Sequence, residues 1–181
     1  MIDEFSDDRT GWARFSDDYE MRFRLARSLN AKPIEIDERG VIQCERCVTF
    51  VMLNPSKASA FILDPTVTRC IGFATDLGAD VMQVANANAL RSTDPKELYK
   101  RAAGSRGDDA TNNEQILLAC KGAYRVIAGW GAHGKLGWRG TTVRRLLADA
   151  EIVVHHLGLT KEGYPRHPLY LKGDTQPEVW T

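Results

Sequence analysis

Four short strand-like runs, each separated from the next by a stretch with helical spacing, constrain the fold of this chain most. They cover residues 48–53, 80–85, 125–129 and 151–157. The first is almost wholly apolar and does not alternate, which is typical of a strand covered on both faces. Strands that alternate with helices imply right-handed crossovers and a largely parallel sheet. We therefore expect a three-layer α/β/α sandwich with a mostly parallel central sheet.

The first of the intervening helices has clear boundary signals. Asp64 can act as its N-cap, and Pro65 suits the first helical position. Val67, Cys70, Ile71 and Ala74 have the spacing of one apolar stripe. Further helices are expected to start near Thr93-Asp94-Pro95 and to cover residues 111–120 and 141–150.

The N-terminal part of the chain has a different pattern. Residues 1–18 are rich in Asp, Ser and Gly and predict a flexible N-terminal arm. Residues 19–26 then alternate between apolar and polar side chains, which predicts an antiparallel strand that could pair at an edge of the sheet. A length of 181 residues suits one domain, so residues 19–181 are expected to form a single α/β domain.

Composition excludes several classes of protein. No run of 18 apolar residues occurs, so a membrane span is not expected, and the acidic N-terminus does not resemble a signal peptide. We expect a cytoplasmic protein. Lys and Arg number 24 and balance 24 Asp and Glu, which argues against a basic coat for nucleic acid but leaves room for a local basic cleft. Cys44 and Cys47 form a lone C-x-x-C without a second pair, so a strand-edge pair is favoured over a metal or redox site, and its role stays open.

Polar residues gather where the predicted strands end. Ligands of open α/β sheets bind beyond the carboxyl ends of the strands, where the loops 54–58, 86–93, 130–140 and 158–171 would meet. Asn54 is followed by Pro55, which holds it extended. Asn86 and Asn88 could each donate to and accept from a base edge. All three asparagines could equally serve as turn residues.

The segment Pro165-Arg166-His167-Pro168 holds a titratable side chain between two prolines. Such rigid presentation suggests a function, although a proline-rich tail over the sheet would look the same. His167 could stabilise a developing anion. Arg166 and Arg91 could contact an anion, and Trp130 could stack on a base.

Several of these strings resemble the bacterial and phage family called domain of unknown function 1643. They are Met52-Leu53-Asn54-Pro55-Ser56, Asp64-Pro65-Thr66, Ala89 to Pro95, Gly129-Trp130-Gly131 and Gly158 to Leu171. The resemblance spans about residues 19–171, and the chain departs from it at Ala87-Asn88, where the family usually carries Leu-Phe. The family name implies no activity.

The three strand-end loops are also similar to those of the uracil-DNA glycosylase superfamily. That resemblance implies a uracil-DNA-glycosylase-like fold in which Asn54 positions a water, Asn86 binds the base edge and His167 stabilises the departing base. The last motif is His-Pro-Leu-Tyr here, not the usual His-Pro-Ser-Pro.

These observations predict an N-glycosidase-like enzyme that acts on a nucleic-acid base or nucleoside and uses no metal or other cofactor. The alternative is a module that binds a nucleotide or nucleic acid without cleaving it, and an enzyme of unrelated chemistry is a third option. The expected catalytic residues are Asn54 and His167. The expected substrate-binding residues are Ser56, Asn86, Asn88, Arg91, Trp130, Arg166 and Tyr170. The partner would be a base-containing ligand, whether nucleoside, nucleotide or DNA, and the oligomeric state is left open.

Overall fold

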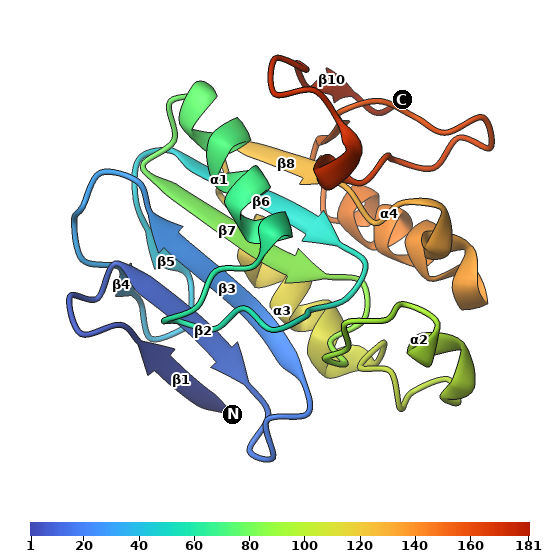
Figure 1. Cartoon of the computed structure of the whole chain (residues 1–181), viewed down its shortest axis with the longest axis horizontal. Helices are drawn as coiled ribbons and strands as arrows, with labels where there is room; N and C mark the ends of the chain where they lie inside the picture. Colours follow the sequence, from blue (N-terminus) through green and yellow to red (C-terminus); the bar gives the residue numbers. More distant parts are fainter.

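The computed structural model describes residues 1–181. A mixed sheet of eight strands forms its centre (Figure 1). The spatial order is β1-β2-β3-β7-β6-β8-β9-β10. These strands are β1 (Ile2–Phe5), β2 (Gly11–Phe15), β3 (Arg22–Ser28), β6 (Cys47–Met52), β7 (Val81–Asn86), β8 (Arg125–Ala128), β9 (Val154–His156) and β10 (Glu178–Val179). A separate hairpin joins β4 (Glu35–Ile36) to β5 (Ile42–Gln43).

The parallel part of the sheet is its centre. Strands β7, β6, β8 and β9 run parallel to one another, and they correspond to the four strand-like runs of the sequence. The remaining pairings, β1 with β2, β2 with β3, β3 with β7 and β9 with β10, are antiparallel. The expectation of a mostly parallel sheet therefore holds for the centre only, because antiparallel strands extend it on both sides.

The N-terminal segment is part of the sheet, so the prediction of a flexible arm over residues 1–18 is wrong. Strands β1 and β2 pair over this segment, and Trp12, Ala13 and Phe15 are buried. β2 also pairs with β3, which places β3 inside the sheet instead of at an edge. The Asp, Ser and Gly residues that suggested mobility form the turns between strands, such as the Ser6–Gly11 turn.

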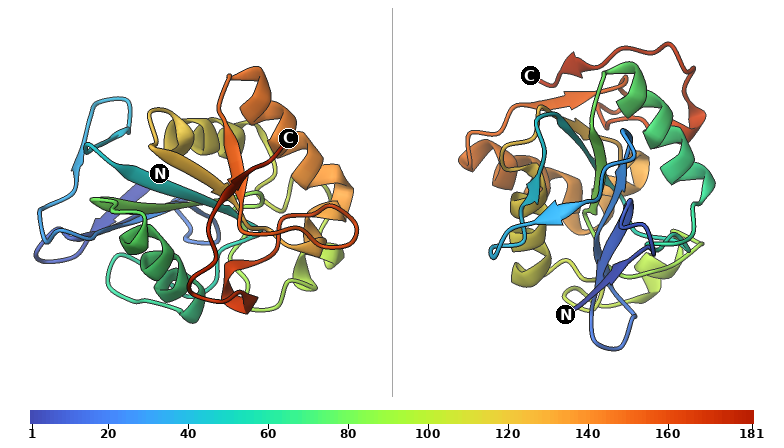
Figure 2. Two further views of the ribbon diagram at one scale, coloured as in Figure 1. Left: turned by 90° about the horizontal axis from the view of Figure 1, so that it is seen from above. Right: turned by 90° about the vertical axis from the view of Figure 1, so that its left-hand side faces the viewer.

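Helices cover both faces of the sheet (Figure 2). α1 (Pro65–Asp76) packs on one face through Val67, Cys70, Phe73 and Ala74. α3 (Ala110–Cys120) and α4 (Arg139–Asp149) pack on the other, as part of a second apolar cluster. The remaining helical segments are the short α2 (Glu97–Lys100) and the 3₁₀ segments η1 (Ala132–Trp138) and η2 (Pro168–Tyr170). None of the helices combines the length and apolarity that crossing a membrane requires.

The predicted start of α1 is confirmed. Asp64 is its N-cap, with the side-chain carboxylate accepting from the Val67 N–H at 2.8 Å, and Pro65 occupies the first turn. The cap satisfies one of the N–H groups that a helix leaves free at its start. This places the first turn of α1 beside the end of β6, where the candidate site lies.

Candidate functional site

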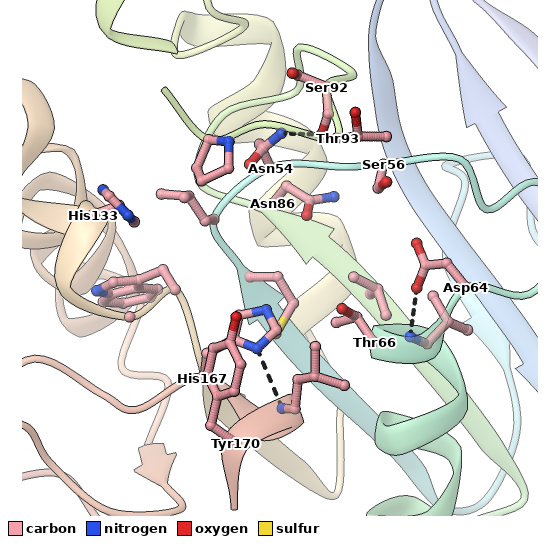
Figure 3. Close-up of a pocket in the computed structure, with 18 of the residues that line it drawn as sticks. Asn54, Ser56, Asp64, Thr66, Asn86, Ser92, Thr93, His133, His167 and Tyr170 are labelled. Carbon is pink, nitrogen blue, oxygen red and sulfur yellow. Dashed lines mark hydrogen bonds between the residues drawn. The ribbon is translucent and has the colours of Figure 1, made fainter. Parts of the chain in front are cut away.

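A cavity of about 530 Å³ opens beyond the carboxyl ends of β6 and β7. The loops that follow β8 and β9 and the first turn of α1 complete its wall (Figure 3). Its volume falls in the range of roughly 300–1,000 Å³ that small-molecule sites occupy. Seven of the nine candidate residues line it: Asn54, Ser56, Asn86, Trp130, Arg166, His167 and Tyr170.

Asn86 ends β7, and its side chain lines this cavity (Figure 3). The residue is 1% exposed, yet neither its Oδ1 nor its Nδ2 has a hydrogen-bond partner in the chain. Leaving a buried amide unpaired costs free energy, and such groups in native proteins normally have a partner. The side chain therefore presents one free donor and one free acceptor to whatever occupies the cavity.

The backbone of Asn86 is held firmly from the α3 side of the sheet. Asn112 in α3 donates from its Nδ2 to the carbonyl oxygens of Asn86 at 2.9 Å and Ala87 at 3.1 Å. Arg139, at the start of α4, donates to the Ala87 carbonyl as well. Two buried side chains thus hold the backbone at Asn86 and Ala87, from which the Asn86 side chain projects.

Asn54 follows β6 and is anchored through one end of its amide. Its Nδ2 donates to the carbonyl oxygens of Pro55 at 3.1 Å, Ser92 at 3.0 Å and Leu90 at 3.4 Å. The Oδ1 atom has no partner in the chain and remains free to accept a hydrogen bond. Asn54 therefore joins the loops after β6 and β7 and can orient a water at the cavity.

His167 lies across the cavity from Asn54, next to Tyr170 (Figure 3). Its Nδ1 accepts from the Leu169 backbone N–H at 3.2 Å, so in the neutral ring the proton resides on Nε2. Burial lowers the pKa of His167, and the nearby Asp64 carboxylate opposes this shift in part. The neutral ring, with Nε2–H as a donor, is therefore the form expected at neutral pH.

The remaining lining residues from the candidate set differ in exposure. Trp130 is 1% exposed and forms part of the wall, where Gly134 and Gly140 pass so close to its ring that a Cβ at either position would collide with it. Tyr170 is 76% exposed and packs at 5.5 Å from His167 between ring centroids, at the mouth of the cavity. Arg166 is exposed and Ser56 is half-buried.

Two candidate residues lie outside the cavity. Asn88 is buried, but its Nδ2 donates to the Leu53 carbonyl at 3.3 Å, so it ties two loops together. Arg91 extends toward the β2–β3 turn, where it donates to the Tyr19 carbonyl and lies over the Phe15 ring. Neither residue lines the cavity, so the structure does not bring these two side chains together with the other seven; the Oδ1 of Asn88 is buried without a partner.

Sequence reasoning missed several lining residues, above all Arg22, Asp64 and Thr66. Asp64 was recognised as a cap only, although its carboxylate also faces the cavity (Figure 3). Arg22 lies in an alternating strand, where the pattern assigns it to the polar face. A β-bulge in β3 changes this: Arg24 pairs with Arg14 and Arg22 with Phe15, so Phe23 is the extra residue.

No group of three or more His, Cys, Asp or Glu side chains is placed to hold a metal ion. Cys44 lies between β5 and β6 and Cys47 is the first residue of β6, and both are free thiols. A hydrogen bond between them raises the pKa of Cys44 and lowers that of Cys47. They lie outside the cavity.

A model of the family described as "Protein of unknown function (DUF1643)" matches residues 22–169. The chain belongs to this family. The match includes every residue of the candidate set except Tyr170, which follows it directly. No similar protein was found among the curated proteins or the solved structures.

Proposed function

We propose that this protein is an N-glycosidase-like hydrolase that binds a nucleic-acid base or nucleoside in the cavity and cleaves the bond from base to sugar. The proposal includes a uracil-DNA-glycosylase-like, three-layer arrangement for the parallel part of the sheet. The observation that carries it is the buried, unpaired amide of Asn86, which shares one cavity with Asn54 and His167.

The Asn86 amide suits the edge of a base. A pyrimidine or purine edge offers an adjacent donor and acceptor, which a carboxamide can meet with two hydrogen bonds at once. Neither amide atom is committed within the chain, and the backbone is held by Asn112. Pairing with a base would therefore recover the cost of keeping this amide buried without partners.

His167 is suited to stabilise the leaving base. Cleavage of the base–sugar bond leaves negative charge on the base, and a donor aimed at that charge lowers the barrier. The Nδ1 of His167 is occupied by the Leu169 N–H, which directs the Nε2 proton away from the backbone. A neutral donor also leaves the uncharged substrate undisturbed before the reaction.

Asn54 has the complementary role of orienting the attacking water. Its Nδ2 is anchored on three carbonyls, so its free Oδ1 has a fixed direction. The sugar becomes strongly electrophilic as the bond breaks. The attacking water therefore needs correct positioning more than it needs activation by a base.

A second candidate function is binding of the base-containing ligand without cleavage. The observation that favours it concerns Asp64, which is the only carboxylate on the cavity wall. This carboxylate already accepts from the Val67 N–H as the cap of α1, so it is engaged in a structural role. Asn54 cannot accept a proton from water as a carboxylate would. Product analysis separates the two functions, since a binding module returns its ligand unchanged.

The direct test is release of free base from nucleosides, nucleotides and oligonucleotides that carry normal, deaminated and alkylated bases, measured by chromatography. We expect one base class to be released. Substituting His167→Gln should lower the rate by about 10²–10³, the usual effect of losing one anion-stabilising donor. Asn86→Leu should abolish binding of the base.

Matched controls come from the chain itself. Asn88→Leu removes a buried asparagine two residues from Asn86 but outside the cavity, and His155→Gln removes a buried histidine of β9 that does not line the cavity. Both should keep the activity of the unmodified protein if they fold. Equal base release by the His167→Gln variant and the unmodified protein would refute the assigned role of His167.

A further inference from the structure

A buried guanidinium on the cavity wall has no role in the chemistry above. Arg22 is 2% exposed and lines the same cavity as Asn86. Its Nη1 donates to the Ala58 carbonyl at 2.8 Å, while its Nε is buried without a partner. No carboxylate forms an ion pair with it. A buried charge without a counter-ion is costly, so an anion that enters the cavity would be stabilised there.

The charges around Arg22 leave an excess of positive charge. Asp64 attracts the guanidinium, but Arg27 and Arg91 both repel it. Burial lowers the pKa of Arg22 to about 10, which still leaves it protonated at neutral pH. Arg27 and Arg91 lie outside the cavity, so Arg22 and Asp64 are the charges of opposite sign on this part of its wall, and the two outer arginines add positive charge behind them.

The backbone at the start of α1 also contributes positive charge to this part of the cavity. Thr66 and Val67 lie in the first turn of α1 and line the cavity. The Val67 N–H is used by the Asp64 cap, whereas the Thr66 N–H donates to no group of the chain. The partial positive charge at the start of a helix adds to that of a nearby guanidinium when an anion binds.

We propose that Arg22 binds the phosphate of a small nucleotide whose base is held by Asn86, so that the ligand of this cavity is a nucleoside monophosphate. The inference rests on the proposed function for the base. Arginine suits a phosphate because its fork of N–H groups matches two phosphate oxygens.

A terminal phosphate fits better than the backbone of a polymer. Arg22 is 2% exposed, which leaves little room for a chain to continue past it. The sequence balances 24 basic with 24 acidic residues, whereas binding of a polyanion relies on an excess of basic groups along its path.

The test compares dissociation constants by titration calorimetry. The probes are uridine, cytidine, adenosine, guanosine and inosine, the 5′- and 3′-monophosphates of each, inorganic phosphate, and a mixed-sequence single-stranded oligonucleotide. For the recognised base we expect one monophosphate to bind at least about tenfold tighter than its nucleoside. Arg22→Met should remove that preference and leave the nucleoside constant within about threefold, and Arg22→Lys should retain part of it.

Arg24→Met is the matched control. Arg24 is buried on the same strand, donates to Gln83 and lies outside the cavity, so its loss should leave the ratio of the two constants unchanged. If Arg22→Met does not fold, the ratio of the nucleoside and monophosphate dissociation constants, measured for the unmodified protein and for Arg22→Lys, still shows whether Arg22 binds the phosphate.

Each remaining outcome overturns at least one of the two proposals. Equal binding of nucleoside and monophosphate, abolished by Asn86→Leu, would refute the phosphate site and leave base recognition standing. Phosphate-dependent binding that is lost in Arg22→Met but indifferent to the base and to Asn86 would keep the anion site and refute base recognition. Tighter binding of the oligonucleotide than of any monophosphate would refute a small-nucleotide ligand, and no binding of any probe would refute both proposals.

Discussion

Two histidines, the buried His155 and the half-buried His167, make the stability of the protein depend on pH at the scale of single residues. Burial lowers the pKa of His155 and of His167 below the ordinary value of 6.5. Between the lowered pKa and 6.5 the unfolded chain binds more protons than the folded one. The free energy of unfolding should therefore decrease as the pH falls through about 6.5.

Denaturant unfolding between pH 8 and pH 5 measures this effect. His155→Gln and His167→Gln should each show a flatter dependence on pH than the unmodified protein, because each removes one such group. An unchanged slope in both variants would contradict the prediction. Base release should also rise with pH through the lowered pKa of His167, since the neutral ring is the form assigned to the reaction.

Asn86, the last residue of β7, and Asn88, two residues later, show the limit of prediction from sequence for single residues. Asn86 and Asn88 were given the same expected role, but only Asn86 faces the cavity, while Asn88 holds the Leu53 carbonyl. Which of two nearby side chains is free depends on loops far away in the chain. The spacing of residues carries no such information.

At the scale of elements, local signals predicted the structure well. Asp64 and Asp109 both cap a helix, accepting from the Val67 and Asn112 N–H groups. Both helices start close to the predicted residues, but only the Asp64 cap is predicted from the sequence, and Asp109 as the cap of α3 is not. Capping and apolar spacing act within one or two turns, so they can be recognised locally. The helix expected after Thr93 is only the four residues of α2, which has no side-chain cap and buries Leu98 alone, so little packing supports it.

The two caps allow stability and function to be separated. Asp64→Ala and Asp109→Ala should each lower the free energy of unfolding by about 1 kcal/mol, the usual cost of losing an N-cap. Only Asp64→Ala should also change ligand affinity, because Asp64 lines the cavity and Asp109 does not. Thermal unfolding and calorimetry on both variants would check this, and equal effects on affinity would contradict it.

At the scale of the whole molecule, the antiparallel extension was the part that the sequence did not predict. β1, β2 and β3 are consecutive antiparallel strands, and only β3 joins them to a distant strand, β7. β1 and β2 are short, so their local pattern alone did not reveal them. Trp12 shows how fully they are integrated. It is 0% exposed and packs beside the guanidinium of Arg24, 4.8 Å from the ring centroid.

Removing the Trp12 side chain tests directly whether the N-terminal segment is a packed part of the sheet. Trp12→Ala should lower the free energy of unfolding by about 3–5 kcal/mol, the usual cost of emptying a large buried site. Phe61→Ala removes an exposed aromatic residue and should change it by less than about 0.5 kcal/mol. Equal, small effects in urea unfolding would mean that the N-terminal segment is only loosely attached.

The bulge at Phe23 separates two arginines that alternation would place together. Arg24 lies toward α3 through Gln83, which donates to Ala119, and Arg22 reaches Ala58 on the side of α1. Gain or loss of a single residue here would move a positive charge from one side of the sheet to the other. Relatives that differ in length within β3 should therefore differ in ligand preference even when every lining residue is identical, so the evolution of this cavity can proceed by insertion and deletion as well as by substitution.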